Sequence, residues 1–228
     1  MKHQKVTLSM GIVLASSLVV APVLAAETPA ATIKSTGSIT MKANEDPNNP
    51  ENGGPLRINN VTNISFGEQV ISGDDQVYAA KMSTEQDEEG NFLPDNIKII
   101  DDRGTNQGWE LQVKNDGFKS VDGTVPLAGT ELTINPVSIV SKSGNLLPST
   151  LKPVILKNDG FKTMVAAKAS EGVGTTTTLF GNLAGEDTEN TNVTLKIPGS
   201  SAKVKDTTYQ TTLTWVLLDE PSAMVLGN

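Results

Sequence analysis

The sequence contains no cysteine and a single histidine, and aromatic residues make up only 4% of it. The lone histidine, His3, lies at the very start of the chain. Disulfide scaffolds need cysteine, while zinc sites and the common nucleophile–base pairs need cysteine or histidine. If the first residues are removed after synthesis, the amino-acid inventory therefore excludes these sites.

The N-terminal segment has the composition of a secretory signal peptide. A basic start leads into Val6–Val20, an apolar run without charge, and small residues follow up to Ala25 and Ala26. This order is typical of a signal peptide. We predict that residues 1–26 are such a segment, with cleavage after Ala25 or Ala26. A membrane anchor is the alternative, but the apolar run falls short of the roughly 20 residues that span a bilayer.

Cleavage there would leave an acidic chain without histidine. The formal net charge of the whole chain is −8, and Lys2, His3 and Lys5 are all in the predicted signal peptide. We expect no nucleic-acid partner and no membrane insertion after cleavage. A chain of about 200 residues can bury a good core, so disulfides are not required. A secreted protein without them is common in bacteria.

The rest of the sequence predicts an all-β fold. Short runs rich in Thr, Val and Ile alternate with turn-forming residues, and no helical period persists over a dozen residues. This pattern favours a β-sandwich of many short, mainly antiparallel strands. The expected strands include Ser38–Lys42, Leu56–Val61, Val77–Met82, Ile97–Asp101, Gly108–Lys114, Glu131–Asn135, Val154–Lys157, Phe161–Lys168, Thr176–Phe180, Val193–Ile197 and Tyr209–Leu218.

The domain organisation is simple. Residues 27–36 are predicted to form a flexible leader, and residues 37–228 a single domain. One internal repeat lies within that domain: Lys114–Lys119 recurs letter for letter as Lys157–Lys162. Asp-Gly between strands is a strong hairpin signal, so we predict two similar hairpins. A duplicated ligand loop is the alternative.

Trp109 and Trp215, the only two tryptophans, each begin a Trp-x-Leu triplet within an alternating polar and apolar run. Residues i and i+2 of a strand point to the same face, so Trp109 lies beside Leu111, and Trp215 beside Leu217. We expect these distant strands to build one shared structural or binding feature.

These features together resemble the WxL-domain surface proteins of low-GC Gram-positive bacteria such as enterococci, lactobacilli and listeriae. The resemblance covers roughly residues 37–221, and two Trp-x-Leu triplets in this order and context are far more specific than one. The segments that carry it are Leu56–Gly67, Asp101–Trp109, Leu127–Leu132, Ala166–Gly174 and Tyr209–Pro221.

The resemblance implies a secreted cell-surface protein that binds the cell wall non-covalently, with peptidoglycan as the ligand. It also implies a surface complex with a membrane-anchored partner protein that recognises WxL domains. Some members of the family act as adhesins toward host matrix proteins. An adhesin or complex component whose main ligand is a protein is therefore the alternative function.

The candidate residues for binding to the wall or the partner are Trp109, Leu111, Trp215, Leu217, Asp102 and Arg103. Both tryptophans could pack in the core, form an exposed binding surface, or lie at the base of a groove. Asp102 and Arg103 could contact a ligand or stabilise a turn. Arg103 is one of only two arginines in the chain.

Catalysis could rely only on carboxylates, as in glycosidases, and nothing in the sequence singles out a pair of them. We therefore expect a binding protein without enzymatic activity, without a cofactor and without a metal site.

Overall fold

A computed structural model describes residues 38–43, 53–87, 90–142, 144–183 and 189–222. The chain divides into two units, Met1–Thr40 and Met41–Asn228. The predicted signal peptide and leader lie outside the described residues. Among the described residues, no helix has the length and apolar character needed to cross a membrane.

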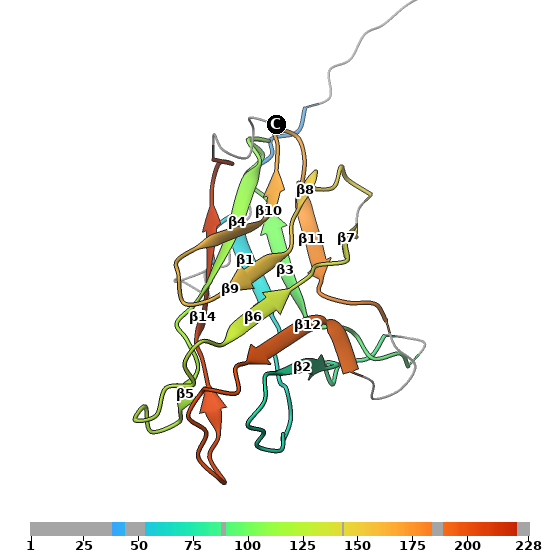
Figure 1. The fold of residues 1–228 in the computed structure, drawn as a ribbon. Coiled ribbons are helices and arrows are strands. Elements are labelled where there is room, and N and C mark those ends of the chain that lie inside the picture. The colour runs from blue at the N-terminus through green and yellow to red at the C-terminus, as the bar shows by residue number, and fades with distance from the viewer. Residues whose placement is uncertain (1–37, 44–52, 88–89, 143, 184–188, 223–228) are drawn as a thin grey trace, which may run out of the picture. The chain divides into compact units, whose positions relative to one another are not determined.

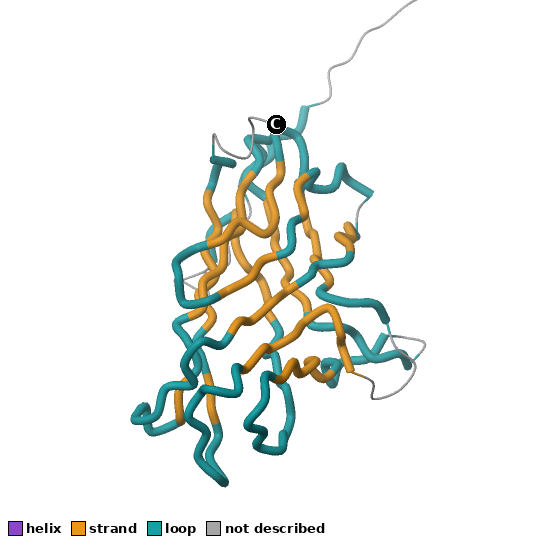
Figure 2. The backbone as a smooth tube through the Cα atoms, in the orientation of Figure 1, coloured by secondary structure: helices purple, strands orange, loops and turns teal. Residues whose placement is uncertain are grey.

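The described residues form fourteen strands and no helix, which confirms the all-β prediction (Figure 2). The strands are β1 Leu56–Val61, β2 Gln76–Lys81, β3 Asn96–Asp101, β4 Trp109–Asn115, β5 Lys119–Ser120, β6 Glu131–Ile134, β7 Ser138–Ser141, β8 Thr150–Leu151, β9 Val154–Leu156, β10 Lys162–Ala167, β11 Gly174–Leu179, β12 Glu189–Ile197, β13 Tyr209–Gln210 and β14 Leu213–Leu218.

Three four-stranded sheets contain most of these strands, and every pairing is antiparallel. Their strand orders are β1-β3-β11-β7, β14-β4-β10-β8 and β2-β12-β6-β9, and β13 pairs with β5 (Figure 1). Most neighbours are distant in sequence, as in Greek-key folds. The arrangement is consistent with the predicted sandwich.

All three sheets contribute to one hydrophobic core. Alternate side chains of the strands point inward, as the period of two requires. Burying such side chains contributes about 1.5–3 kcal/mol each to folding. The buried core residues are Ala80, Ile97, Ile99, Trp109, Leu111, Val113, Leu132, Ile134, Val154, Leu156, Met164, Val165, Ala167, Phe180, Val193 and Leu195.

Two strand predictions need correction. Residues 38–43 form no strand, and Ile39 and Met41 are 79% and 80% exposed. The predicted strand Tyr209–Leu218 is interrupted after Gln210, and its two parts, β13 and β14, pair in different sheets. The short strands β5, β7 and β8 were not predicted, since two to four residues carry little pattern of their own.

The hairpin prediction for the repeat is wrong. β4 and β5, which flank the first copy, do not pair with each other, and neither do β9 and β10, which flank the second. Both copies instead lead the chain from one sheet to another. Turn residues permit a reversal of the chain, but they do not determine which strands pair afterwards.

One buried carboxylate of this fold has an oxygen without a hydrogen-bond partner among the described residues. Asp95 is 1% exposed, and its Oδ2 has no hydrogen-bond partner in the described part of the chain. Burial raises the pKa of Asp95 from 3.8 to about 6, against the lowering effect of a hydrogen bond with Thr62. The folded state therefore holds this proton more tightly than the unfolded chain. Stability should fall as the pH rises from about 4 through 6.

We predict that Asp95→Asn stabilises the protein at pH 7.5, by up to roughly 3 kcal/mol, and changes little at pH 4. The asparagine removes the buried charge that forms above pH 6. Thermal unfolding of both proteins at the two pH values tests this. Equal melting temperatures at pH 7.5 would contradict the prediction.

Candidate functional site

The two Trp-x-Leu motifs lie on neighbouring strands of one sheet. In the antiparallel pair of β4 and β14, Trp215 is opposite Val113 and Leu217 is opposite Leu111. Directly opposite residues of a strand pair project to the same face. The expectation that these distant strands build one feature is thus confirmed for the backbone, and their side chains form one continuous apolar row.

That row faces the core. Trp109, Leu111 and Val113 are completely buried, and the indole Nε1 of Trp109 donates a hydrogen bond to the carbonyl of Gly172 at 3.1 Å. A buried indole needs such a partner for its N–H. Of the open interpretations, core packing therefore describes Trp109.

Two glycines allow Trp109 this position. Gly172 has φ +66°, and a Cβ there would come within 2.7 Å of the Trp109 Nε1. Gly108, directly before the tryptophan, has φ +82°, and its Cβ would come within 2.1 Å of the Ala167 carbonyl oxygen. A larger residue would press on the Trp109 indole at position 172, and on the backbone of Ala167 and Lys168 at position 108.

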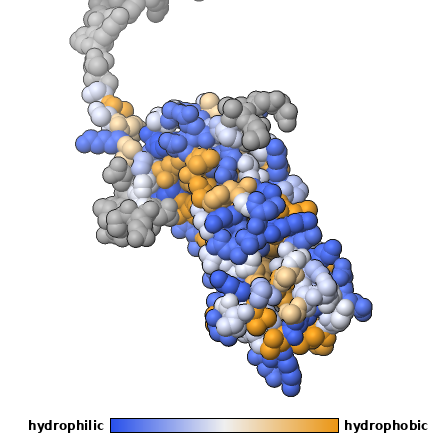
Figure 3. Space-filling view, turned by 60° about the vertical axis from the view of Figure 1, so that its left-hand side comes forward, coloured by the Kyte–Doolittle hydropathy of each residue, from blue (hydrophilic) through white to orange (hydrophobic). Residues whose placement is uncertain are grey.

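The second motif is less enclosed. Trp215 is partly buried against the core, with its indole stacked on Phe180 at 5.9 Å between ring centroids and 10° between planes. Leu217 is also only partly buried. Within the described residues, β14 is the terminal strand of its sheet. On the face turned forward in Figure 3, the surface carries an apolar patch bordered by hydrophilic residues.

Arg103 clamps the loop before β4 to the end of β14. Its Nε and Nη2 each donate to the Asp101 carboxylate at 2.8 Å, and Nη2 also donates to the Gly108 carbonyl at 2.6 Å. Its Nη1 donates to the Asp219 carbonyl at 2.6 Å. The hydrogen bonds with Asp101 raise the pKa of Arg103 and keep it charged. This geometry uses the arginine to stabilise a turn.

Asp102 points to a different neighbour. Its carboxylate lies 3.8 Å from the Arg57 Nη2 on β1, and its backbone N–H donates to the Pro55 carbonyl. Both arginines thus pair with adjacent aspartates, Asp101 at the end of β3 and Asp102 directly after it. The structure brings Trp109, Leu111, Trp215, Leu217 and Arg103 together around β4 and β14, while Asp102 faces β1.

Glu110, the central residue of the first triplet, was not predicted to matter. It is fully buried on the face of β4 opposite Trp109. Its carboxylate accepts hydrogen bonds from the Gln112 side chain and the Ser222 N–H, both at 2.7 Å, and from the Thr163 hydroxyl. Burial raises the pKa of Glu110, but these hydrogen bonds outweigh it and lower the pKa overall.

Glu110 therefore fastens the segment after β14 to β4, as Arg103 does. The alternating pattern predicts only that Glu110 faces away from the tryptophan. The covering segment comes from far along the chain, so no local signal indicated its burial. Within the described residues, no group of three or more His, Cys, Asp or Glu side chains could hold a metal ion.

Comparison with known families gives one match. A family model described as "WxL domain surface cell wall-binding" matches residues 19–221, which include both Trp-x-Leu strands, Asp102 and Arg103. No curated protein and no solved structure matches the chain significantly.

Proposed function

Because this chain belongs to the WxL family of surface cell wall-binding domains, we propose that it attaches non-covalently to peptidoglycan as part of a surface complex. It is a cell-surface protein of the Gram-positive wall, and its family is one of binding domains. The second member of the complex is a membrane-anchored protein that recognises WxL domains. The observation that carries the proposal is the family match across both Trp-x-Leu strands.

We propose that the candidate residues serve this attachment in two ways. Trp109, Leu111 and Arg103 are enclosed and hold β4 and β14 in register. Trp215 and Leu217 retain solvent-accessible surface on the terminal strand and lie closer to any ligand. Asp102 supports the loop through Arg57.

Binding to purified peptidoglycan tests the proposal. The chain has a formal net charge of −8, and the anionic polymers of Gram-positive walls would repel it. Salt shortens that repulsion to about 10 Å at 0.1 M. We predict that sedimentation with isolated walls holds or strengthens from low to moderate salt, or as the pH falls toward 5. A steep loss with added salt would mean attraction between opposite charges and would contradict this prediction.

A protein ligand is the second candidate function. Within the described residues β14 is the last strand of its sheet, which favours a protein ligand, because a strand edge without a neighbour can accept a strand from another protein. Parallel pull-downs on peptidoglycan and on the partner's ectodomain separate the two. Retention by the ectodomain alone would make the partner protein the main ligand. Retention by neither would favour the adhesin alternative, in which the main ligand is a host matrix protein. Retention by peptidoglycan alone would establish direct wall binding.

A further inference from the structure

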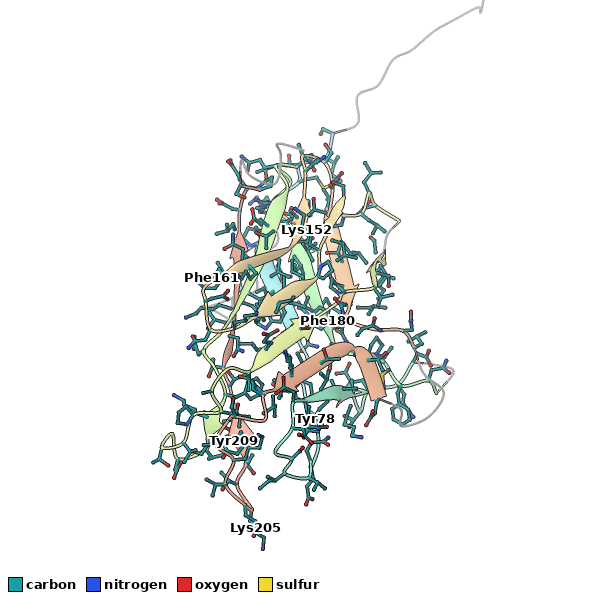
Figure 4. All side chains as sticks on the ribbon, in the orientation of Figure 1. Tyr78, Lys152, Phe161, Phe180, Lys205 and Tyr209 are labelled. Atoms are coloured by element: carbon teal, nitrogen blue, oxygen red, sulfur yellow. The ribbon has the colours of Figure 1, made fainter. Side chains whose placement is uncertain are left out.

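The two copies of the repeat converge on one cleft. The Cβ position that Gly117 lacks lies 3.3 Å from the Asn158 Nδ2, so the first copy contacts the second. The Lys114 ammonium lies 5.6 Å from the centre of the Phe161 ring, which Figure 4 labels on the segment between β9 and β10. The cleft has a volume of about 220 Å³ and is lined by Asp116–Lys119, Pro126–Thr130, Lys157 and Asn158.

A shared turn conformation does not explain why the two copies are identical. Asn115 is buried at the end of β4, where its side-chain oxygen accepts hydrogen bonds from the Gly117 N–H and the Thr211 hydroxyl. Asn158, the matching residue of the second copy, is exposed and has φ +61°. A positive φ is uncommon for a residue other than glycine. The same letters therefore serve different local structures, and different positions of the two copies line the cleft.

The cleft combines paired charges with two hydrogen-bonding groups that have no partner among the described residues. Asp116 pairs with Lys114 at 3.0 Å, and Lys157 pairs with Glu131 at 2.9 Å. The Lys119 ammonium and the Asn158 side-chain amide make no hydrogen bond or ion pair with any residue that the structure describes. Donors and acceptors thus line the cleft side by side.

The charges and the size limit the ligand. The charges of Asp116 and Lys157 are each paired within the protein, so Lys119 is the one cation of the lining without a partner among the described residues, which is too little positive charge to favour a polyanion. The volume of the cleft is below the ~300–1,000 Å³ of pockets for drug-sized ligands. Phe118 and Leu127 add apolar surface to the lining. A single sugar ring, with hydroxyl groups on its rim and C–H groups on its faces, fits this combination.

We propose that this cleft binds one N-acetylated sugar unit of a glycan strand, an assignment that rests on the proposed attachment to peptidoglycan. An acetamido group offers one N–H donor and one carbonyl acceptor. The Asp116 carboxylate accepts from the N–H or a hydroxyl, and the Lys119 ammonium and Asn158 amide donate to the carbonyl or to ring oxygens.

The cleft also gives the Trp-x-Leu strands a role in binding. β4 ends at Asn115, where the cleft begins, and the Asp116 N–H donates to the Thr212 carbonyl just before β14. The strand pair that Trp109 anchors in the core therefore holds one wall of the cleft. The buried tryptophan positions this site without contacting the ligand.

The test is a titration of the protein with N,N′,N″-triacetylchitotriose, followed by protein NMR. Asn158→Gly removes the amide but accepts the positive φ, and Lys119→Ala removes the ammonium. Each should weaken the trisaccharide affinity about fivefold to tenfold, the usual effect of one lost hydrogen bond. The matched controls are Asn106→Gly, at another positive φ of +57°, and Lys205→Ala, another exposed lysine. Both should bind like the unaltered protein.

Each outcome decides one point. Unchanged trisaccharide binding by both cleft variants would overturn the proposed sugar site. A protein that binds walls but not the trisaccharide would also overturn the sugar site, while the proposed attachment to the wall would be kept. A protein that binds the trisaccharide but not walls would overturn the proposed function and keep the cleft. Equal binding of cellotriose, which lacks the acetamido group, would overturn the N-acetyl preference. Melting curves confirm that each variant is folded.

Discussion

Replacing Trp109 with alanine should lower the free energy of unfolding by about 3–5 kcal/mol, and the same change at Trp215 should cost clearly less. Trp109 is completely buried, and its loss would leave a cavity and an unpaired Gly172 carbonyl. Trp215 lies on a terminal strand and is partly exposed, so its variant loses less buried area and one stacking contact with Phe180. Urea denaturation of the two variants measures the difference.

Trp109→Phe is the matched control, because it keeps an aromatic ring while deleting the indole N–H. It should fall between the unaltered protein and Trp109→Ala. Equal losses for the alanine variants of Trp109 and Trp215 would contradict the difference in burial. Wall or partner binding is interpreted only for variants that remain folded. A folded Trp215→Ala variant that no longer binds would support the second motif as part of the attachment surface, whereas normal binding would exclude it.

Replacing Arg103 with alanine should cost about 3–5 kcal/mol, and lysine should recover only a small part of that loss. Lysine cannot form the planar fork with which Arg103 holds the Asp101 carboxylate and also contacts the carbonyls of Gly108 and Asp219. Asp101 is 3% exposed, so alanine leaves its nearly buried charge with only the Arg103 backbone N–H as a partner, and lysine offers one ammonium in place of the fork.

The chain's other arginine provides a matched control. Arg57→Lys should cost much less, because the Arg57 Nη2 lies 3.8 Å from the Asp102 carboxylate, which is 31% exposed, and an ammonium can replace this contact. Thermal unfolding of the two lysine variants compares them directly. If Arg103→Lys unfolded at the same temperature as Arg57→Lys, the clamp between the β4 loop and the end of β14 would be unimportant for stability.

The repeat shows where local sequence rules stop. Lys114–Lys119 and Lys157–Lys162 have identical turn chemistry, yet neither joins paired strands, and their asparagines adopt different conformations. Turn propensity acts over a few residues. Strand pairing is decided by burial over the whole domain, so identical segments in different surroundings adopt different structures.

The all-β class, the approximate position of most long strands and the membership in the WxL family could all be predicted from the amino-acid sequence. These properties depend on alternation, turn residues and motif order, which are all local or linear features of the chain. Even the side-by-side placement of Trp109 with Leu111 follows from the two-residue period of a strand.

The burial of the Trp-x-Leu side chains could be learned only from the tertiary structure. The alternation of polar and apolar residues along a strand indicates which side chains share a face of the sheet. It does not indicate whether other parts of the protein cover that face. The pairing of β4 with β14 against the core buries Trp109, and Ser222, in the segment after β14, donates a hydrogen bond to the buried Glu110. Each outcome depends on residues far away in sequence, because burial is a property of the assembled layers and not of any single strand.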